Sequence, residues 1–542
     1  MAKKKRQKTP LPIKISFSRP FHPLLVAAFP VLFLYATNIN ELLLNSIFLP
    51  LAVLISFALL IFLIINFFLK DAGKTSMLVT FYFLLFFTYG HIKNTLGDFD
   101  FRIGTFGIGP DKTLTVTWIA LFVLITYFTI KTRKNLKVVT DFLNIASVFL
   151  VVVSLANIVV FELKTGRLAS FFETSQAKTQ TADSQLIKPD TPPDIYYLIF
   201  DRYASKYTLD QYYDYDAGDF FGFLTKKGFY VAADSHANYP ATFLSLASSL
   251  NMKELNYLSS EIGEESNDRT RVYEMLQGYK AQALLQSIGY KYIHVGAWWQ
   301  PTRVNKYADY NFTLKPENLG YLNLDEFSTK LMETTILPPI LSALIKNNEV
   351  ESIYSRNNHR NMILYELGTL EKVVEKFSSP KFVFAHVLVP HGPYVLDNNC
   401  EPLTQEEAEK IPNERNYLNQ MECANKKIES LVSKILSKSS KSAIIILQAD
   451  EGPAPIIHRL GSKWQESSTD AIQEKTGVLN AIYTPDNNKK IFEQTMTPVN
   501  TFRRIFNFYF GAKFEILEDK VYVFEDPDHP YKLFDVTDKV LP

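Results

Sequence analysis

The sequence predicts a two-part α/β protein: a bundle of five transmembrane helices, then an extracytoplasmic domain whose largely parallel sheet is flanked by helices. Two observations lead to this fold class. Five uncharged stretches lie within the first 162 residues, and beyond residue 193 short apolar runs alternate with helical patterns. The 57 Lys and Arg nearly balance the 56 Asp and Glu, so a net charge of +1 argues against bulk nucleic-acid binding.

The five uncharged stretches are each long enough to cross a bilayer. They cover residues 21–40, 42–69, 76–92, 113–130 and 142–161. A helix needs about 20 apolar residues to span the hydrocarbon core, with roughly 17–25 tolerated. No soluble core of this size could bury five such helices in series. The first stretch lacks a small-residue cleavage site and a second follows at once, which argues against a cleaved signal peptide.

The short loops between the stretches carry Lys and Arg unevenly. Most of them lie in residues 1–20 and in the loops after the second and fourth stretches, whereas the opposite loops hold Lys93, Arg102 and Lys112. Positively charged loops remain in the cytoplasm. We therefore expect a multi-pass protein of the cytoplasmic (inner) membrane with a cytoplasmic N-terminus. The chain after Glu162 is then periplasmic or extracellular.

The stretches as drawn contain no Asp, Glu, Lys or Arg, on which a proton or ion path usually depends. We therefore disfavour a transporter and interpret the helices as an anchor or a groove for a lipid. Residues 163–192 are rich in Thr, Gln, Ser, Asp and Pro, which is typical of a linker. The expected parts are a basic tail (1–20), a five-span domain (21–162), this linker (163–192) and an outer domain (193–542).

The only two cysteines, Cys400 and Cys423, both fall in the outer domain. Disulfides persist outside the cytoplasm, and a bridge closing this loop would stabilise the fold by roughly 3 kcal/mol. We expect a disulfide, with two free thiols as the alternative.

Three apolar runs of the outer domain predict buried strands that end at ligand-type side chains. Residues 195–200 precede Asp201, residues 382–389 precede His391, and residues 443–447 precede Asp450 and Glu451. Continuous apolar runs separated by helical patterns (361–377, 424–436) indicate a parallel sheet covered on both faces. Ligands of such sheets bind beyond the carboxyl ends of the strands. His386, inside the second run, is interpreted as a core histidine.

The segment 235–251 (SHANYPATFLSLASSLN) supplies a hydroxyl group. After Pro240 the pattern becomes helical, which puts Thr242 near a helix N-terminus, where free N–H groups and the dipole favour an anion. The Thr242 hydroxyl is either a helix cap or a nucleophile facing a phosphate. From this segment alone, the cap is the commoner role.

The order of these motifs resembles the alkaline phosphatase/sulfatase superfamily. A strand ending in Asp is followed by NYPAT before SLASSLN, then by PHGPY, then by a strand ending in DEG. The similarity is greatest to the membrane-anchored branch, which includes lipoteichoic acid synthases and phosphoethanolamine transferases. The resemblance extends over residues 191 to about 510 and implies an alkaline-phosphatase-like, sulfatase-like outer domain.

The resemblance also implies roles for single residues. It assigns Asp201 and Asp450 to a catalytic metal, Thr242 to the metal and the nucleophile, and His391 to contacts with the substrate or leaving group. Glu451 departs from the family, which usually has histidine there. A metal shell of Asp201, Thr242, Asp450 and Glu451 is all oxygen, which favours Mn or Mg and admits Ca or Zn. A formylglycine-type sulfatase is not expected, because no Cys/Ser-x-Pro-x-Arg motif stands at Thr242.

These residue types suit phosphoryl transfer, because a divalent cation can activate a hydroxyl and screen phosphoryl oxygens. We predict a metal-dependent phosphotransferase or phosphohydrolase acting on a lipid-linked or cell-envelope phosphodiester. His391 would protonate the leaving oxygen or position the acceptor. A glycan hydroxyl as acceptor makes a transferase and water makes a hydrolase, and the sequence leaves both open.

The alternative function is a non-catalytic envelope binding or assembly protein with a decayed sulfatase-like site, of which Glu451 would be the sign. The expected binding partner is a membrane lipid or a lipid-linked or envelope glycan, and the sequence points to no partner protein.

Four further side chains are weaker candidates for substrate binding. His236 and Asn238 flank the Thr242 turn, where stabilising the turn is an equally good role. His294 and Trp298 follow a short apolar run. Trp298 and its neighbour Trp299 could stack on a sugar or a lipid isoprene, or pack in a core or against the membrane.

Overall fold

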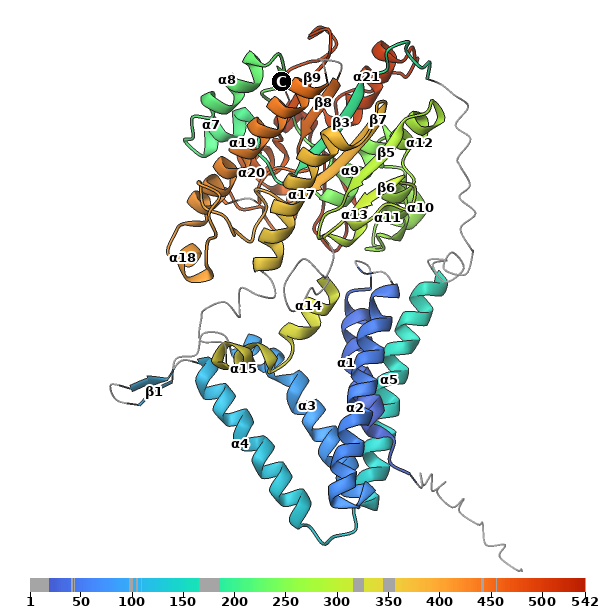
Figure 1. The fold of residues 1–542 in the computed structure, drawn as a ribbon, viewed down its shortest axis with the longest axis vertical. Coiled ribbons are helices and arrows are strands. Elements are labelled where there is room, and N and C mark those ends of the chain that lie inside the picture. Colours follow the sequence, from blue (N-terminus) through green and yellow to red (C-terminus); the bar gives the residue numbers. More distant parts are fainter. Residues whose placement is uncertain are drawn as a thin grey trace, which may run out of the picture. The chain divides into compact units, whose positions relative to one another are not determined.

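The structure is a computed structural model (Figure 1). It describes residues 19–39, 42, 44–96, 101–103, 106–108, 110–164, 186–314, 326–344, 356–439, 443–454 and 456–541. The predicted basic tail up to residue 18 and residues 165–185 of the predicted linker lie outside the described residues. The chain divides into two compact units. The first, here the helical unit, is Met1–Lys164 with Phe327–Lys346; the second, here the sheet unit, is Thr165–Glu326 with Asn347–Pro542.

Apolar helices build the helical unit. They are α1 (His22–Thr37), α2 (Phe48–Leu69), α3 (Ala72–Leu96), α4 (Pro110–Lys131) and α5 (Lys137–Lys164), with a 3-10 turn (Leu44–Ile47) and a hairpin of β1 (Phe101–Ile103) and β2 (Phe106–Ile108). Within the described residues, α2, α3, α4 and α5 are long and apolar enough to cross a membrane, while α1 is a shorter apolar helix. Each of the five predicted stretches is therefore a helix.

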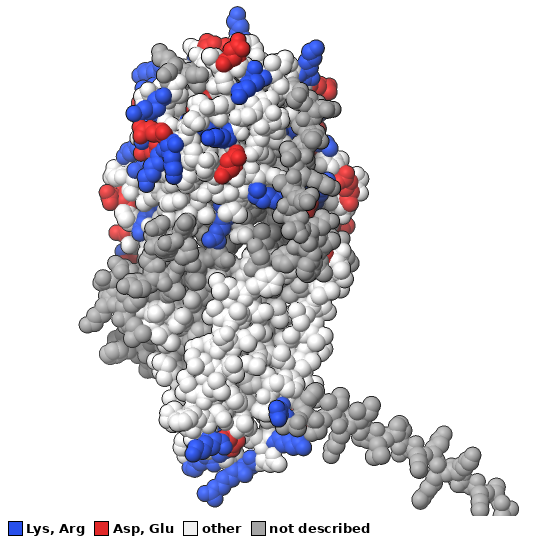
Figure 2. All heavy atoms as spheres, turned by 45° about the vertical axis from the view of Figure 1, so that its right-hand side comes forward, with Lys and Arg blue, Asp and Glu red and all other residues white. Residues whose placement is uncertain are grey.

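Charged side chains are unevenly placed on the helical unit. Figure 2 shows a broad face of this unit without them, and Lys and Arg gathered at one end. The basic loops after α2 and α4 lie side by side, since Lys74 Nζ donates to the Ile130 carbonyl at 2.9 Å. These are two of the loops that the charge argument places on one side of the membrane.

One segment that we expected in the outer domain packs with the helical unit instead. It holds α14 (Glu326–Glu333) and α15 (Leu337–Leu344). The Gly90 N–H of α3 donates to the Thr334 carbonyl at 3.0 Å. A Cβ on Gly90 would lie 2.1 Å from the Glu333 carbonyl oxygen, so glycine is needed for this close approach. The expected boundary at 193–542 therefore does not describe one continuous compact unit.

A seven-stranded sheet lies at the centre of the sheet unit, in the order β4-β9-β8-β3-β7-β5-β6. Its strands are β3 (Asp194–Phe200), β4 (Tyr230–Val231), β5 (Lys291–Val295), β6 (Tyr310–Phe312), β7 (Lys381–Val387), β8 (Ala443–Gln448) and β9 (Asn480–Tyr483). Strands β8, β3, β7, β5 and β6 are parallel, and β9 runs antiparallel to both β8 and β4. The three predicted strands are β3, β7 and β8, and they are neighbours at the centre.

Helices cover both faces of this sheet (Figure 1). Alternate side chains of β3 enter two separate cores. Phe200 and its face pack with α8 (Gly218–Lys226), α17 (Asn357–Lys376) and α19 (Asn413–Lys438). Ile199 and its face pack with α9 (Thr242–Asn251), α11 (Thr270–Gln277), α12 (Lys280–Ser287) and α21 (Thr501–Tyr509). Burial on both faces explains why the strand sequences are continuously apolar.

The other elements of the sheet unit are short connections. They are α7 (Lys206–Tyr212), α10 (Leu258–Ile262), α13 (Gln300–Arg303), α18 (Gln405–Glu409), η4 (Trp464–Glu466), α20 (Thr469–Thr476), η5 (Pro498–Asn500), α22 (Thr537–Val540) and a hairpin of β10 (Tyr522–Phe524) and β11 (Leu533–Asp535). Cys400 and Cys423 form a disulfide with their Cα atoms 5.0 Å apart, which links the loop before α18 to α19.

Candidate functional site

The register of the three central strands brings together two carboxylates and an imidazole. Ile199 of β3 pairs with His386 of β7 and with Gln448 of β8. Since side chains alternate along a strand, Asp201 and Asp450, two residues further on, lie on the same sheet face as His386. One ligand atom from each of the three lies within 4.8 Å of the others, and all three residues are buried.

The Asp201–His386–Asp450 cluster fits a divalent metal ion. Asp201 Oδ1, His386 Nε2 and Asp450 Oδ2 are buried without a hydrogen-bond partner. His386 Nε2 lies 3.5 Å from Asp201 Oδ2, so the hydrogen bond between them is marginal. An unsatisfied buried polar atom costs about 1–3 kcal/mol, and a bound cation would satisfy all three. Carboxylate and imidazole groups are ordinary ligands of divalent metals.

The His386 ring is fixed from its other side. Its Nδ1 lies 3.0 Å from the Thr302 hydroxyl, and the Thr302 carbonyl in turn accepts a bond from His294 Nε2 at 2.7 Å. The Trp299 ring meets the imidazole edge-on, with the ring centroids 5.8 Å apart. A hydrogen bond at one ring nitrogen that leaves the other free is the usual support of a metal-binding histidine.

Thr242 is the first residue of α9, and its side chain lies near the cluster. The residue before it, Ala241, is the extended N-cap of α9, and no side chain caps this helix. The Thr242 side chain instead lies near the Asp450 carboxylate and acts to lower the pKa of that carboxylate. The helix-cap alternative for Thr242 is therefore wrong, and the hydroxyl faces the cluster with free α9 N–H groups beside it.

Burial and mutual repulsion separate the proton affinities of the two aspartates. Burial raises the pKa of Asp450 to about 7, and the neighbouring Asp201 carboxylate adds to this effect. Burial also opposes ionisation of Asp201, but His391, His386 and Arg202 together hold the pKa of Asp201 well below its usual range. The metal-free cluster thus keeps one carboxylate charged and gives the other a proton affinity near neutral pH.

Glu451, the predicted fourth ligand, places its carboxylate between two cations. Its Oε1 pairs with Arg202 Nε at 2.8 Å and its Oε2 with Lys475 Nζ at 3.0 Å. Gly452 explains the tight fit of this loop against α20, because a Cβ there would lie 2.6 Å from the Lys475 carbonyl oxygen. The cluster thus offers a nitrogen from His386 that the predicted all-oxygen shell did not include, while both Glu451 oxygens face cations. Glu451 as a metal ligand stays a prediction.

A pocket of about 360 Å³ opens onto the cluster. Thr242 and His391, to which the resemblance assigns the nucleophile and the substrate contact, both line it. Burial lowers the pKa of His391, so its imidazole is neutral at pH 7. Trp298 and Trp299 also line the pocket, together with Trp464 and Phe524, whose rings stack with centroids 4.5 Å apart. Aromatic walls suit a sugar or an apolar chain.

The other three weak candidates use their polar atoms inside the fold. His236 lies between the Thr476 hydroxyl at 2.9 Å and the Asp234 carboxylate at 3.2 Å. Asn238 accepts from the Val499 N–H and donates to the Lys520 carbonyl. His294 bonds to Tyr292 and Thr302. None of the three lines the pocket among the described residues, so the structure favours their positioning roles.

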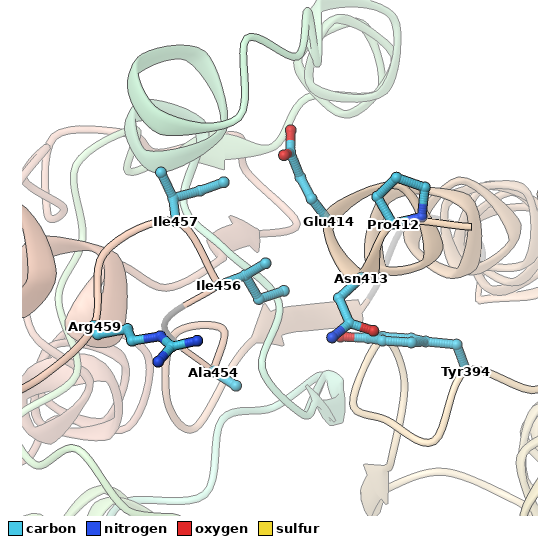
Figure 3. A pocket seen from close by; sticks show the side chains of 8 residues that line it. All are labelled: Tyr394, Pro412, Asn413, Glu414, Ala454, Ile456, Ile457 and Arg459. Atoms are coloured by element: carbon cyan, nitrogen blue, oxygen red, sulfur yellow. The ribbon is translucent and has the colours of Figure 1, made fainter. Parts of the chain in front are cut away.

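A second hollow, of about 510 Å³, lies among segments that follow β7 and β8 and the start of α19. Figure 3 shows its wall built from three parts of the chain: Tyr394 after β7, residues 412–414 at the start of α19, and, after β8, Ala454, Ile456, Ile457 and Arg459. The first and third follow the strands that carry His386 and Asp450. The hollow therefore lies next to the loops that follow β7 and β8.

Three residues of this site do not stand out in the sequence. His386, predicted as a core histidine, is a candidate ligand here, and Arg202 and Lys475 belong to none of the predicted motifs. A signal existed for His386, since it lies in a strand that ends beside the aspartate-bearing strands. The sequence does not give strand register, however, and register decides which side chains meet.

The fold and the cluster define an α/β protein with a candidate metal site at the carboxyl ends of its central strands. The sulfatase family model matches residues 233–507, more than half of the 542 residues, and the chain belongs to this family. The predicted superfamily is thereby confirmed. No curated protein sequence matches the chain.

Three solved structures are similar at low identity. The C-terminal periplasmic domain of EcEptC from Escherichia coli is 12% identical, with a TM-score of 0.41, over 66% of this chain and 97% of that chain. The C-terminal periplasmic domain of phosphoethanolamine transferase EptC from Campylobacter jejuni is 12% identical, with a TM-score of 0.37, over 60% and 92%. The integral membrane protein lipooligosaccharide phosphoethanolamine transferase A (EptA) from Neisseria meningitidis is 12% identical, with a TM-score of 0.37, over 90% and 96%.

Proposed function

We propose that this chain is a membrane-anchored, metal-dependent phosphotransferase or phosphohydrolase with Thr242 as its nucleophile. The observation that carries the proposal is the position of Thr242, at the start of α9 and in the same pocket as Asp201 of the buried Asp201–His386–Asp450 cluster. Asp201, His386 and Asp450 would hold a divalent ion, with the Thr242 oxygen next to it. Such an ion lowers the pKa of a nearby hydroxyl and screens phosphoryl oxygens. The two carboxylates suit Mn or Mg, and the imidazole nitrogen favours Zn over Mg or Ca.

The chemistry divides into two displacements at phosphorus. In the first, Thr242 Oγ1 bonds to phosphorus, the bond to the leaving alcohol breaks, and the threonine proton reaches the leaving oxygen through pocket water. In the second, an acceptor hydroxyl attacks the Thr242 phosphoester and Thr242 leaves. His391, which is neutral at pH 7 because burial lowers its pKa, accepts the acceptor's proton and returns it to Thr242. Either water or a glycan hydroxyl can serve as the acceptor, because each supplies the proton that returns to Thr242.

The substrate we propose is a lipid-linked or cell-envelope phosphodiester reached from the outer face of the membrane. Five apolar helices support a cytoplasmic N-terminus and an outer domain from about residue 193, provided that the shorter α1 crosses the membrane as α2 to α5 can by their length. The basic loops after α2 and α4, which lie side by side, support the same orientation. The disulfide between Cys400 and Cys423 is consistent with an oxidising compartment. A protease added to intact spheroplasts should cleave the outer domain; complete protection would contradict this orientation.

The test of the nucleophile uses the full chain in detergent with Mn²⁺ and a chromogenic phosphodiester. Thr242→Ala should reduce turnover to background while bound metal, measured by elemental mass spectrometry, is retained. Ser245→Ala is the matched control, because Ser245 is a buried α9 hydroxyl one turn further on. Acid quenching of the wild type during turnover should trap a phosphate on the peptide that contains Thr242. Normal turnover of Thr242→Ala would overturn the proposal and leave the binding-protein alternative.

A further inference from the structure

Glu451 holds two cations at the edge of the pocket. Its side chain is 5% exposed, and its two oxygens contact Arg202 Nε and Lys475 Nζ. Because both oxygens are occupied, Glu451 brings two positive groups to one place. A buried ion pair contributes little net stability once its desolvation is counted. Stability alone is therefore a weak reason for this arrangement, and the question is what the cations contact.

Arg202 is held rigidly while the end of its side chain is left free. Its backbone has φ of 61°, a left-handed conformation that is uncommon for a residue with a side chain. Its N–H donates to Asp450 Oδ1 at 3.3 Å, and its carbonyl accepts from the Tyr417 hydroxyl at 2.9 Å. Only Nε of the guanidinium is bonded to Glu451, and within the described part of the chain the two Nη atoms make no hydrogen bond. The side chain is 28% exposed and lines the pocket.

Lys475 approaches the pocket from another element. It lies near the end of α20, its side chain is 5% exposed, and Glu451 is its ion-pair partner. The loop after β8 is fixed against it, because the Gly452 N–H donates to the Lys475 carbonyl at 2.8 Å. Arg202, Lys475 and Thr242 line the same pocket. Two cations from two different parts of the chain therefore line the pocket that also contains Thr242.

We propose that Arg202 and Lys475 form a clamp for the phosphoryl group of the substrate, and that Glu451 is the positioning residue that holds both. This inference rests on the proposed function, because the phosphoryl group is the one that Thr242 would attack. An arginine with Nε anchored offers two Nη atoms, which match two oxygens of a tetrahedral phosphoryl group. With a divalent ion at the cluster and these two cations, the pocket carries excess positive charge, which suits an anionic phosphoester.

The test measures binding of orthophosphate to the full chain by calorimetry, with Mn²⁺ bound and its content checked. Arg202→Gln and Lys475→Met should each raise the Kd roughly tenfold or more, because a charge-assisted hydrogen bond is lost. Arg459→Gln is the matched control, since Arg459 is an exposed arginine that lines the second hollow rather than this pocket. Its Kd should equal that of the wild type.

The variant Glu451→Asp tests whether the position of the carboxylate matters, since the charge of the side chain is kept. It keeps the carboxylate but withdraws it from both cations, so the Kd for orthophosphate should rise severalfold while Mn²⁺ content stays the same. Because Glu451 acts partly through Arg202, the loss of affinity in the double variant Arg202→Gln/Glu451→Asp should be smaller than the sum of the losses in the two single variants. If the losses of orthophosphate affinity in the two single variants simply add up in the double variant, the positioning role of Glu451 is overturned. Loss of Mn²⁺ in Glu451→Asp would overturn it as well. Wild-type affinity in Arg202→Gln and Lys475→Met would overturn the clamp.

A second arm distinguishes free phosphate from a lipid headgroup. In nanodiscs of phosphatidylcholine, adding phosphatidylglycerol should raise the apparent Kd for orthophosphate if the clamp receives a lipid phosphate, and leave it unchanged if it receives a soluble one. The turnover assay tests the proposed function independently of the clamp. Turnover that survives Thr242→Ala contradicts the role of Thr242 as nucleophile, whereas it does not affect the binding of orthophosphate by Arg202 and Lys475.

Discussion

His386 Nε2 lies 3.5 Å from Asp201 Oδ2, although the two residues come from different strands far apart in the chain. The parallel register of β3 and β7 places them on one sheet face, and β8 adds Asp450 from the other side. The candidate metal site is therefore a product of three adjacent strands. Glu451, which follows Asp450 directly, points its carboxylate to Arg202 and Lys475 instead.

The ligand set predicts a pattern of metal content. Asp201→Asn, His386→Gln and Asp450→Asn should each lose the ion that the wild type binds, because each removes one of three converging ligand atoms. Glu451→Gln should retain about one ion per chain. His236→Gln is the control for a buried histidine outside the cluster. Elemental mass spectrometry of protein purified without chelator measures this, and loss of metal only in Glu451→Gln would contradict our assignment.

Thr302 should strengthen metal binding through its hydrogen bond to His386. Thr302→Val removes the hydroxyl that contacts His386 Nδ1 while keeping the volume of the side chain. Loss of a supporting hydrogen bond of this kind typically weakens metal affinity about 10- to 100-fold. Competition with a metal-binding dye measures the Kd. Thr369→Val, at an equally buried threonine on α17, should leave the Kd unchanged. Equal effects of the two variants would show a packing defect.

Metal affinity should rise with pH. Burial and the Asp201 carboxylate raise the pKa of Asp450 to about 7 in the metal-free protein, so protons compete with the metal below that pH. Affinity should increase as the pH rises through about 7 and then level off. Calorimetry in buffers of different ionisation enthalpy should detect proton release at about pH 6 and little at about pH 8. Proton release that does not change with pH would contradict this origin.

The same pKa sets the sign of a stability change. The pKa of Asp450 in the folded protein lies above its unfolded value near 4. At pH values between these two pKa values, the metal-free folded protein therefore binds one more proton than the unfolded chain does. The stability that this proton supplies is lost as the pH rises through about 7. The melting temperature of the metal-free protein should fall accordingly, and by less in Asp450→Asn. An identical fall in that variant would assign the effect to another group.

The disulfide should stabilise the sheet unit. Cys400→Ala/Cys423→Ala removes the link between the loop before α18 and α19. Loss of a bridge that closes a loop of this length should lower the free energy of unfolding by about 3 kcal/mol. Thermal melts of both proteins, with and without reductant, measure the change. The wild type should approach the variant in reductant, and a variant as stable as the oxidised wild type would contradict the expectation.

The sequence by itself determined the class of fold and half of the site. Uncharged stretches indicate membrane helices because the thickness of a bilayer sets their length. Apolar runs such as 195–200 indicate buried strands because both faces of the sheet are covered. Asp201, Thr242 and Asp450 could be predicted because each stands at the end of a strand or the start of a helix. Such positions can be read from local pattern.

Only the tertiary structure decided which side chains meet. His386 became a candidate ligand through the register of β7 against β3, and register is set by packing across the whole sheet. Glu451 became a partner of Arg202 and Lys475 because α20 and the end of β3 approach it from distant parts of the chain. Residues 327–346 joined the helical unit through contacts with α3. Each outcome depends on long-range contacts, which local sequence patterns do not contain.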